Sequence, residues 1–231
     1  MFKILSKYGT NAKTVKSDEG GEYLTAILYM APADLVEGIN VCAMAIMAGC
    51  RLPCLNTAGR GIFDNVQNAR IRKTVLYRDN RKLFMEYLRQ DLSKHETYCL
   101  KKGIIPVVRL NGTSDIDYRK IASEFPNIQF YDYTKVYNRV SKTIPKNYHL
   151  TISYSEANEN YTKNAVEFAN KYGVNLAVVF RNKALPATFL GRKVINGDKD
   201  DLRFLDPKNV IVCLYAKGKA KKDTSGFVIN N

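Results

Sequence analysis

Residues 103–133 read GIIPVVRLNGTSDIDYRKIASEFPNIQFYDY, and this stretch decides the fold. Gly103 marks a break before Ile104–Leu110, a short apolar run rich in β-branched residues that predicts a buried strand. A polar loop follows, and a short helix over Asp117–Phe125 is ended by the proline after it. Ile128–Tyr133 predicts the next strand. A strand, a helix and a second strand within about thirty residues form a crossover unit, which places the two strands parallel.

The same alternation continues on both sides of this unit. Further buried strands are predicted at Glu22–Met30, Tyr148–Tyr154, Asn175–Phe180 and Val210–Tyr215, and helices at Phe63–Tyr77, Arg81–Leu100 and Ala157–Tyr172. Strands that alternate with helices predict an α/β fold with a mainly parallel sheet. Such a sheet is either doubly wound or a partial (β/α)6 TIM-like barrel. We favour the barrel, because polar residues follow each strand at the edge where such sheets bind ligands.

Composition limits the organisation and the partners of the chain. With 231 residues and 45% hydrophobic content, the chain can bury one sizeable core, and we expect a polar N-terminal arm over 1–20 and a single α/β domain over 21–231. The net charge of +14 favours a polyanionic partner, above all nucleic acid, although a membrane surface, an acidic protein or solubility alone would also explain it. Because no apolar run is long enough to span a bilayer and no secretory signal is visible, we expect a cytoplasmic protein with no membrane partner.

Polar side chains follow the predicted strand ends and should meet at one rim of the sheet. They are Asn111, Thr113, Ser114 and Asp115 after the second strand, Asp132 in the third, Ser155 and Glu156 after the fourth, Arg181 and Asn182 after the fifth, and Lys217 after the sixth. Every strand ends in a polar loop for ordinary reasons, so the cysteines at the same rim give this pattern its weight. We expect Asp132, Ser155 and Glu156 to contact a cofactor, whereas Asp115 is explained equally well as a helix cap or as a catalytic group.

Three cysteines, Cys42, Cys50 and Cys54, lie within thirteen residues after the first strand. Glycine and proline in this segment let the backbone fold back and bring the sulfur atoms together. Thiolates suit zinc and iron–sulfur clusters, and three ligands leave one coordination position for a further ligand or a substrate. The alternative is three buried cysteines without a metal. Cys99 and Cys213 lie in apolar patterns and are interpreted as packing residues.

Two basic regions could hold phosphate groups. The first follows the cysteines and includes Arg60, Arg70, Arg72 and Lys73, and the second comprises Lys217, Lys219, Lys221 and Lys222. Each region alone is typical of a solvated surface, but together they would form a basic path past the rim. His95 is interpreted as a residue of a solvated helix face, and the acidic segment 197–201 as a solvated turn.

Several motifs together resemble the phage gene product 88 family. They are NVCAMAIMAGCRLPCLNTAGR, the AR-x-RKT segment at 69–74, VVRLNGTSDIDY at 107–118, FYDYTK at 130–135, DLRFLDP and AKGKAKKDTSGFV, and they extend through nearly the whole chain. The resemblance implies a phage protein that works in the host cytoplasm, and it implies no established activity.

A more distant likeness is to the radical S-adenosylmethionine superfamily. There, three cysteines after the first barrel strand hold a 4Fe–4S cluster whose open iron binds S-adenosylmethionine. The present spacing is Cys-x7-Cys-x3-Cys in place of that family's Cys-x3-Cys-x2-Cys. The likeness implies that Cys42, Cys50 and Cys54 bind the cluster, and that Asn111 and Asp115 correspond to the segment that contacts the cofactor.

These observations lead to three hypotheses. The first is a phage enzyme with a thiolate-bound cluster that acts on nucleic acid or a nucleotide precursor, with Asp115 and Asn111 as further contacts to cofactor or substrate. The second is a non-enzymatic nucleic-acid-binding protein in which zinc fixes the cysteine segment. The third is an interaction protein, directed at a host factor, that contains no metal.

Overall fold

The computed structural model describes residues 2–6, 8–9 and 12–231. Its sheet contains the six expected strands, β1 (Tyr23–Ile27), β2 (Ile105–Arg109), β3 (Gln129–Thr134), β4 (Tyr148–Ser153), β5 (Leu176–Phe180) and β8 (Ile211–Tyr215). All six are parallel and lie side by side in chain order. The prediction of an α/β fold with a mainly parallel sheet is therefore confirmed.

Three further strands were not predicted. β7 (Arg192–Asn196) lies parallel to β8 and forms an antiparallel hairpin with β6 (Thr188–Phe189), while β9 (Val228–Ile229) pairs with the end of β5. The first five strands show no reversal of order, as expected of a partial barrel. β8, however, is inserted between β5 and β7, and no pairing joins β1 to the far edge in the described part of the chain. The sheet is thus mixed and open, and the closed barrel is not shown.

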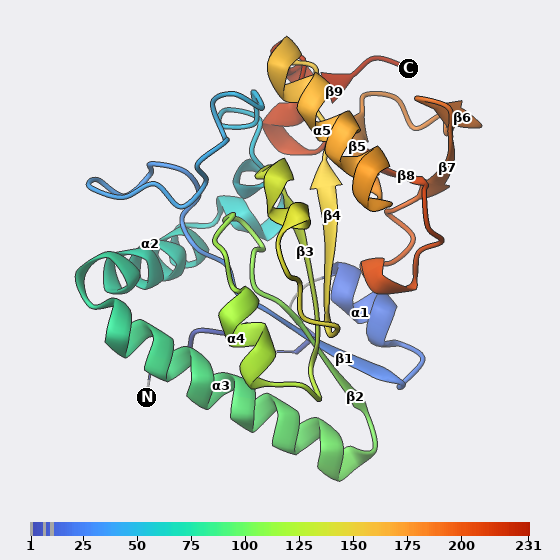
Figure 1. Ribbon diagram of the computed structural model, residues 1–231. Coiled ribbons are helices and arrows are strands. Elements are labelled where there is room, and N and C mark those ends of the chain that lie inside the picture. The colour runs from blue at the N-terminus through green and yellow to red at the C-terminus, as the bar shows by residue number, and fades with distance from the viewer. Residues whose placement is uncertain (1, 7, 10–11) are drawn as a thin grey trace.

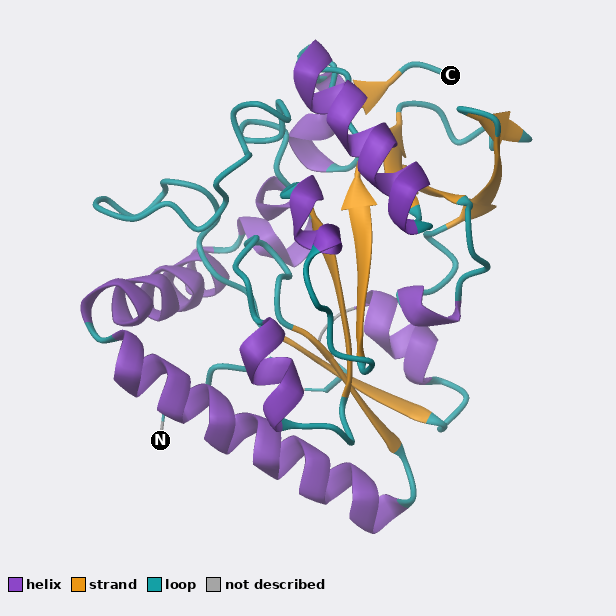
Figure 2. Cartoon of the chain, in the orientation of Figure 1, coloured by secondary structure: helices purple, strands orange, loops and turns teal. Residues whose placement is uncertain are grey.

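The helices are α1 (Ala12–Asp18), α2 (Asp64–Asp79), α3 (Arg81–Lys102), α4 (Arg119–Glu124) and α5 (Glu159–Tyr172), as Figures 1 and 2 show. The two long connecting helices have the caps that their sequences suggest. The side chain of Asn80 accepts from the backbone N–H of Leu83 at the start of α3, and Gly103 ends that helix in the left-handed conformation. Asn158 and Gly173 have the same roles in α5.

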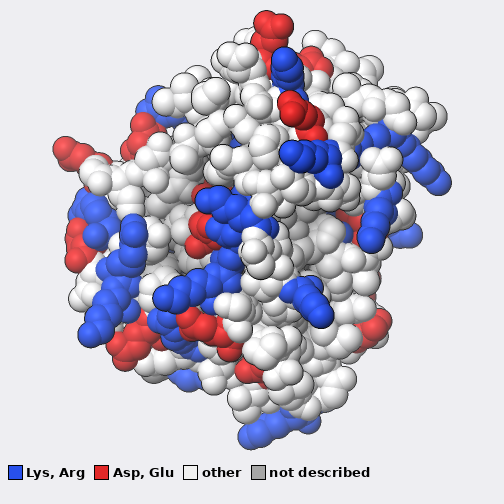
Figure 3. All heavy atoms as spheres, in the orientation of Figure 1, with Lys and Arg blue, Asp and Glu red and all other residues white. Residues whose placement is uncertain are grey.

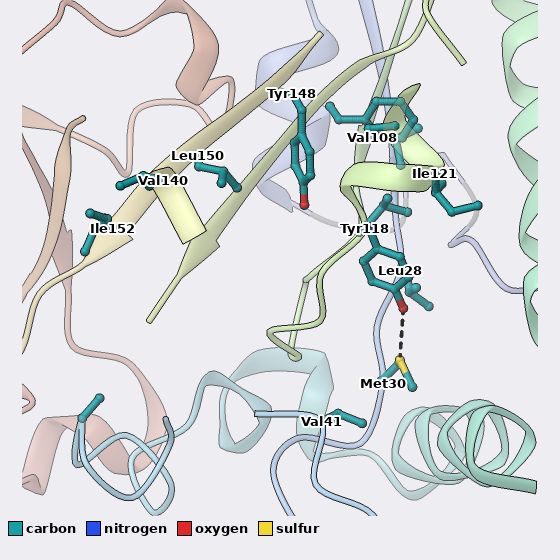
Figure 4. Close-up of a cluster of buried hydrophobic side chains, with 14 of the residues drawn as sticks. Leu28, Met30, Val41, Val108, Tyr118, Ile121, Val140, Tyr148, Leu150 and Ile152 are labelled. Carbon is teal, nitrogen blue, oxygen red and sulfur yellow. Dashed lines mark hydrogen bonds between the residues drawn. The ribbon is translucent and has the colours of Figure 1, made fainter. Parts of the chain in front are cut away.

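One large buried cluster lies between the sheet and the helices. Phe84, Leu88 and Leu92 of α3 pack with alternate strand residues such as Val108 and Phe130. The same cluster continues to the rim, where the hydroxyl of Tyr118 donates to the sulfur of Met30 at 3.8 Å (Figure 4). The carboxyl ends of the strands are therefore held by the same core that holds the helices.

The other face of the sheet is covered by the segment between β7 and β8. Asp201 in this segment accepts from the hydroxyl of Tyr131 at 2.7 Å and pairs with Arg109 at 3.2 Å. Its backbone N–H donates to the hydroxyl of Ser17 in α1 at 2.9 Å. We call residues 200–206 the crossing segment, because it joins the β8 side of the sheet to the β1 side. Residues 197–198 form the expected turn, but Asp201 is not solvated, since it is 1% exposed and pairs with a cation on the sheet.

The described part of the N-terminal arm contains α1, and Leu5 forms an antiparallel bridge with Leu28 beside the edge strand β1. One other expectation needs correction. His95 does not lie on a solvated helix face, since it is 2% exposed. Cys99 and Cys213 are fully buried, as expected of packing residues. Among the described residues, no helix combines the length and apolar character needed to cross a bilayer.

Candidate functional site

The segment between β1 and α2 carries the three cysteines to the carboxyl ends of the strands, and Figure 2 shows most of it as loop. We call residues 42–54 the cysteine loop. The hydroxyl of Ser155 donates to the carbonyl of Ala48 at 2.8 Å, and that of Ser225 donates to the carbonyl of Gly49 at 3.0 Å. Gly49 has a φ of 63°, and a Cβ there would lie 2.6 Å from that of Ala157. The loop is thus clamped against β4 and the C-terminal segment at a position that only glycine fits.

The cysteine loop carries three free, partly buried cysteines, Cys42, Cys50 and Cys54. Burial raises the pKa of Cys42, and Asp115 and the other two cysteines raise it further electrostatically. The sulfur of Cys42 donates to the carbonyl of Thr113 at 3.7 Å, and the sulfur of Cys54 accepts from the backbone N–H of Asn56 at 3.5 Å. Cys42 therefore lies beside the loop after β2, and the gathering of all three sulfur atoms stays a prediction.

The chemistry of these donors suits a soft metal, but their arrangement does not. No group of three or more His, Cys, Asp or Glu within residues 2–6, 8–9 and 12–231 is placed to hold a metal ion. Burial raises the pKa of Cys42 to about 12 and also raises that of Cys54, so both remain thiols at neutral pH. Because these side chains are not arranged as metal ligands, a cluster or a zinc ion does not fit the loop as it stands, and we derive no chemical step from one.

Two cations act electrostatically on Cys54. Arg70 of α2 is 8% exposed, donates to the side-chain oxygen of Asn56, and lies 4.9 Å from the ring centroid of Tyr29. Lys135, which follows β3, donates to the hydroxyl of Ser153 at 2.8 Å and lies 5.0 Å from the ring centroid of Phe227. Both cations lower the pKa of Cys54, against the larger effect of burial.

Neither of these two cations has an acidic partner. No carboxylate in the described ranges forms an ion pair with Arg70 or Lys135. The Nε of Arg70 is also buried and has no hydrogen-bond partner among those residues. We call the region around Cys54, Arg70 and Lys135 the mouth of the sheet. It combines a thiol with two positive charges that no carboxylate of the described residues pairs with.

Asp115 and Asn111, the expected catalytic residues, lie beside the mouth and are fully engaged. The carboxylate of Asp115 accepts from the hydroxyl of Thr134 at 2.9 Å and from the backbone N–H of Lys135 at 2.7 Å, and it pairs with Arg139 at 2.7 Å. The side chain of Asn111 accepts from Ser114 and Ile116. These contacts fasten the loops after β2 and β3. Asp115 does not cap α4, which begins two residues after Asp117. A catalytic role of either residue stays a prediction.

The three expected cofactor contacts differ in exposure. Asp132 is fully buried and accepts from the backbone N–H and the side-chain amide of Asn111 and from the hydroxyl of Tyr148, at 2.7, 3.0 and 2.6 Å. Burial raises its pKa to about 6. Ser155 is also fully buried and clamps the cysteine loop. Only Glu156 is exposed; it lines a polar cavity of about 340 Å³ with Arg181, Asp223, Thr224, Gly226, Val228, Ile229 and Asn230.

The two basic regions meet at one place. In the 3-10 turn η5 (Gly218–Lys222), the backbone N–H of Lys219 donates to the hydroxyl of Thr57, at the end of η1 (Leu55–Thr57), at 3.2 Å. This contact brings exposed Lys219, Lys221 and Lys222 next to the turn η2 (Gly59–Ile62), which contains Arg60. We call these four residues the basic surface. It borders the cysteine loop.

The remaining basic residues do not join this surface. Lys217 pairs with Asp198 at 2.7 Å, Arg70 points into the mouth, and burial lowers the pKa of Lys73 to about 8. Arg72 is exposed on α2. On the face shown in Figure 3, positive and negative side chains are interspersed. A continuous basic path past the rim is therefore not seen on that face.

Lys135 belongs to a basic stretch, 135–146, that the sequence also shows near Tyr131, Tyr133 and Tyr137, but it was not assigned to the rim. The third strand extends to Thr134, one residue beyond its predicted end, so Lys135 is the first side chain after it. The rule that selected the other rim residues would have selected Lys135 had the strand end been placed correctly. No pattern in α2 distinguished the inward Arg70 from the exposed Arg72.

Comparison with known proteins gives one match. A family model described as "Gene product 88" matches residues 3–231. No curated protein and no solved structure matches the chain. The likeness to radical S-adenosylmethionine enzymes gains no support from these comparisons.

Proposed function

The chain belongs to the gene product 88 family, and on that premise we propose that it is a phage-encoded enzyme whose mouth binds the anionic part of a nucleotide or of a nucleic acid. The observation that carries the proposal is the pair of cations beside Cys54. Arg70 and Lys135 come from different elements, both lower the pKa of Cys54 against the larger effect of burial, and neither forms an ion pair with a carboxylate in the described structure. A partly buried cation without a counter-ion is costly unless an anion compensates it.

The surroundings of the mouth favour a phosphate ester over a small inorganic anion. The basic surface borders the cysteine loop and would receive further phosphates of a nucleic acid. The rings of Tyr29 and Phe227, which already contact the two cations, provide apolar walls for a base or a sugar. Cys54 would then lie directly beside the bound phosphate.

The test is calorimetric titration with a mononucleotide and with a short single-stranded oligonucleotide. Arg70→Gln and Lys135→Gln should each weaken binding by on the order of tenfold, because each removes one charge-assisted contact. Lys171→Gln is the matched control: Lys171 is exposed in the last turn of α5, at the opposite end of the sheet from the mouth. Unchanged affinity in both mouth variants, with a folded protein, would refute the proposal.

The second candidate keeps the three thiols as metal ligands, either for an iron–sulfur cluster of radical S-adenosylmethionine type or for a structural zinc in a nucleic-acid-binding protein. The gathering of Cys42, Cys50 and Cys54 on one loop favours it. Both forms require the loop to bring the sulfur atoms closer and to lose the thiol protons.

Anaerobic purification with metal and sulfide analysis separates these forms. Iron and sulfide that are lost in Cys42→Ala, Cys50→Ala and Cys54→Ala would establish the cluster, and one zinc lost in the same variants would establish the structural site. The absence of metal from the anaerobic protein would leave the cysteines as core residues and would remove this second candidate.

A further inference from the structure

A second cavity lies away from the mouth, between the N-terminal arm, β1 and α3. Its volume is about 460 Å³, in the range that accommodates a small ligand. It is lined by Lys3, Leu5, Ser6, Tyr8, Ala26, Asp91, Lys94, His95 and Tyr98. None of these residues belongs to the cysteine loop, the mouth or the basic surface.

His95 forms the floor of this cavity and fixes one of its walls. Its Nε2 lies 3.1 Å from the carbonyl oxygen of Val107, and its Nδ1 lies 2.7 Å from the hydroxyl of Tyr8. A carbonyl can only accept, so Nε2 carries the proton and Nδ1 accepts from Tyr8. Burial lowers the pKa of His95 to about 4, so the ring is neutral at physiological pH. Tyr8 is therefore held in one orientation by a buried acceptor.

Two tyrosine rings form the opening. Tyr8 and Tyr98 stack with their ring centroids 5.8 Å apart and an interplanar angle of 18°. Tyr8 is 40% exposed and Tyr98 is 47% exposed, which leaves aromatic surface open to a ligand. Exposed aromatic faces of this kind are platforms on which planar ligands stack.

Positive charge lies beside these rings. Lys3 and Lys94 line the cavity and are both exposed. The carboxylate of Asp91 also lines the cavity, and one of its oxygens accepts from the backbone N–H groups of Ile4 and Leu5 at 2.7 and 3.1 Å. The cavity thus combines stacking surface with two ammonium groups and one carboxylate.

We propose that this cavity binds a planar aromatic ring that carries an anionic group, such as a mononucleotide or an aromatic carboxylate. The ring stacks on Tyr98, and the anion contacts Lys3 and Lys94. This site is separate from the mouth and does not depend on the function proposed for it.

The test is calorimetric titration of the whole chain with adenosine monophosphate, with 4-hydroxybenzoate and with inorganic phosphate. At least one of the two aromatic anions should bind with millimolar or better affinity at one site that survives Arg70→Gln, and inorganic phosphate should not bind there. Which aromatic anion binds more tightly identifies the source of the ligand. Tyr98→Ala should weaken that binding by on the order of tenfold, and Lys94→Gln should weaken it as well.

Tyr172→Ala is the matched control, because Tyr172 is also 40% exposed and stacks on another ring, that of Phe168, but lies at the end of α5. It should leave the affinity unchanged. The proposal fails if neither aromatic anion binds to the Arg70→Gln variant. It also fails if the Tyr98→Ala and Tyr172→Ala variants bind the aromatic anion with equal affinity. It also fails if inorganic phosphate competes as well as the aromatic anions do.

Discussion

At the scale of single residues, the ion pair between Asp115 and Arg139 allows a test of whether Asp115 has a structural or a catalytic role. The two side chains are 9% and 6% exposed. Asp115→Ala leaves Arg139 buried without its partner, and we expect it to lower the free energy of unfolding by about 3–5 kcal/mol. Asp117→Ala removes an exposed pair with Arg119 and should cost at most about 1 kcal/mol. Urea denaturation of both variants measures the difference.

The outcome bears directly on the catalytic prediction for Asp115. A variant that unfolds at the wild-type urea concentration, yet has lost activity on the substrate of the mouth, would show that Asp115 acts in the reaction. Large destabilisation would show that its carboxylate is needed to hold the loops after β2 and β3.

The lowered pKa of His95 predicts that the stability of the protein depends on pH. Its pKa is lowered from 6.5 to about 4 in the folded protein because burial disfavours the charged ring. A lowered pKa means that the contribution to stability is complete above pH 6.5 and is lost as the pH falls through about 4, since the unfolded chain then binds the proton more readily. The loss should reach about 3 kcal/mol.

The measurement compares wild type with His95→Gln between pH 4 and pH 7. Glutamine keeps a donor and an acceptor but does not titrate in this range. Asp132 contributes the opposite slope in the same window, since its pKa is raised to about 6. It contributes equally to both proteins and cancels in the difference. A difference in the free energy of unfolding that stays constant with pH would contradict the assignment of His95.

His95 also shows which contacts cannot be predicted from the sequence. The apolar spacing that predicted α3 does not decide whether a histidine in that helix is solvated, as we expected of His95, or buried. The buried acceptor and donor that His95 needs come from Val107 and Tyr8, which lie 12 residues and 87 residues away in the chain. Local patterns carry no information about such partners.

At the scale of elements, Gly49 and Gly103 allow a matched test of the clamp on the cysteine loop. Both have positive φ, 63° and 67°. A Cβ at Gly49 would lie 2.6 Å from the Cβ of Ala157 and 2.7 Å from the hydroxyl of Ser225, whereas a Cβ at Gly103 would meet nothing within 4 Å. Both alanine variants carry the left-handed strain of about 1–2 kcal/mol, and only Gly49→Ala adds crowding of about 1–3 kcal/mol.

Chemical denaturation and thiol labelling together measure the effect. Gly49→Ala should be the less stable variant, and its cysteines should react faster with a disulfide reagent because the loop lifts from Ser225 and Ala157. Equal stability and equal labelling rates in the two variants would mean that the loop is not clamped at Gly49.

The elements themselves were largely predictable because their signals are local. Caps at Gly103 and Gly173 and apolar runs such as Ile211–Tyr215 mark helices and strands without reference to the rest of the chain. β6 and β9 were not predicted because each has two residues, too few to show an alternating pattern. β7 was not predicted because its sequence, RKVIN, is mostly polar. These strands exist because neighbouring backbone is available to pair with them.

At the scale of the whole molecule, the effect of the net charge of +14 on nucleic-acid binding depends on where the basic residues lie on the surface. If the basic surface contacts phosphates, the affinity for single-stranded DNA should fall with salt, and the triple variant of Lys219, Lys221 and Lys222 to glutamine should lower the log–log slope by roughly 2. Fluorescence anisotropy over a salt series measures the slope. Lys101 and Lys102, exposed at the end of α3, provide the control double variant, which should leave the slope unchanged.

The order of the strands from β1 to β5 could be predicted from the sequence, because each crossover places its strand beside the preceding one. The insertion of β8 between β5 and β7 did not follow from it. The crossing segment was also missed, because the charges of 198–201 predict solvent, whereas Arg109 on the sheet makes Asp201 a buried partner. The position of β8 and the burial of the crossing segment both depend on contacts between residues that are distant in the chain.

The clamp between Gly49 and Ser225 joins residues that are 176 positions apart. On a ribosome that adds about 5–20 residues per second, the cysteine loop emerges roughly 9–35 seconds before the residue that fastens it. In that interval the contact between Ser225 and Gly49 cannot form, and we expect the thiols of the loop to be more accessible than in the finished fold.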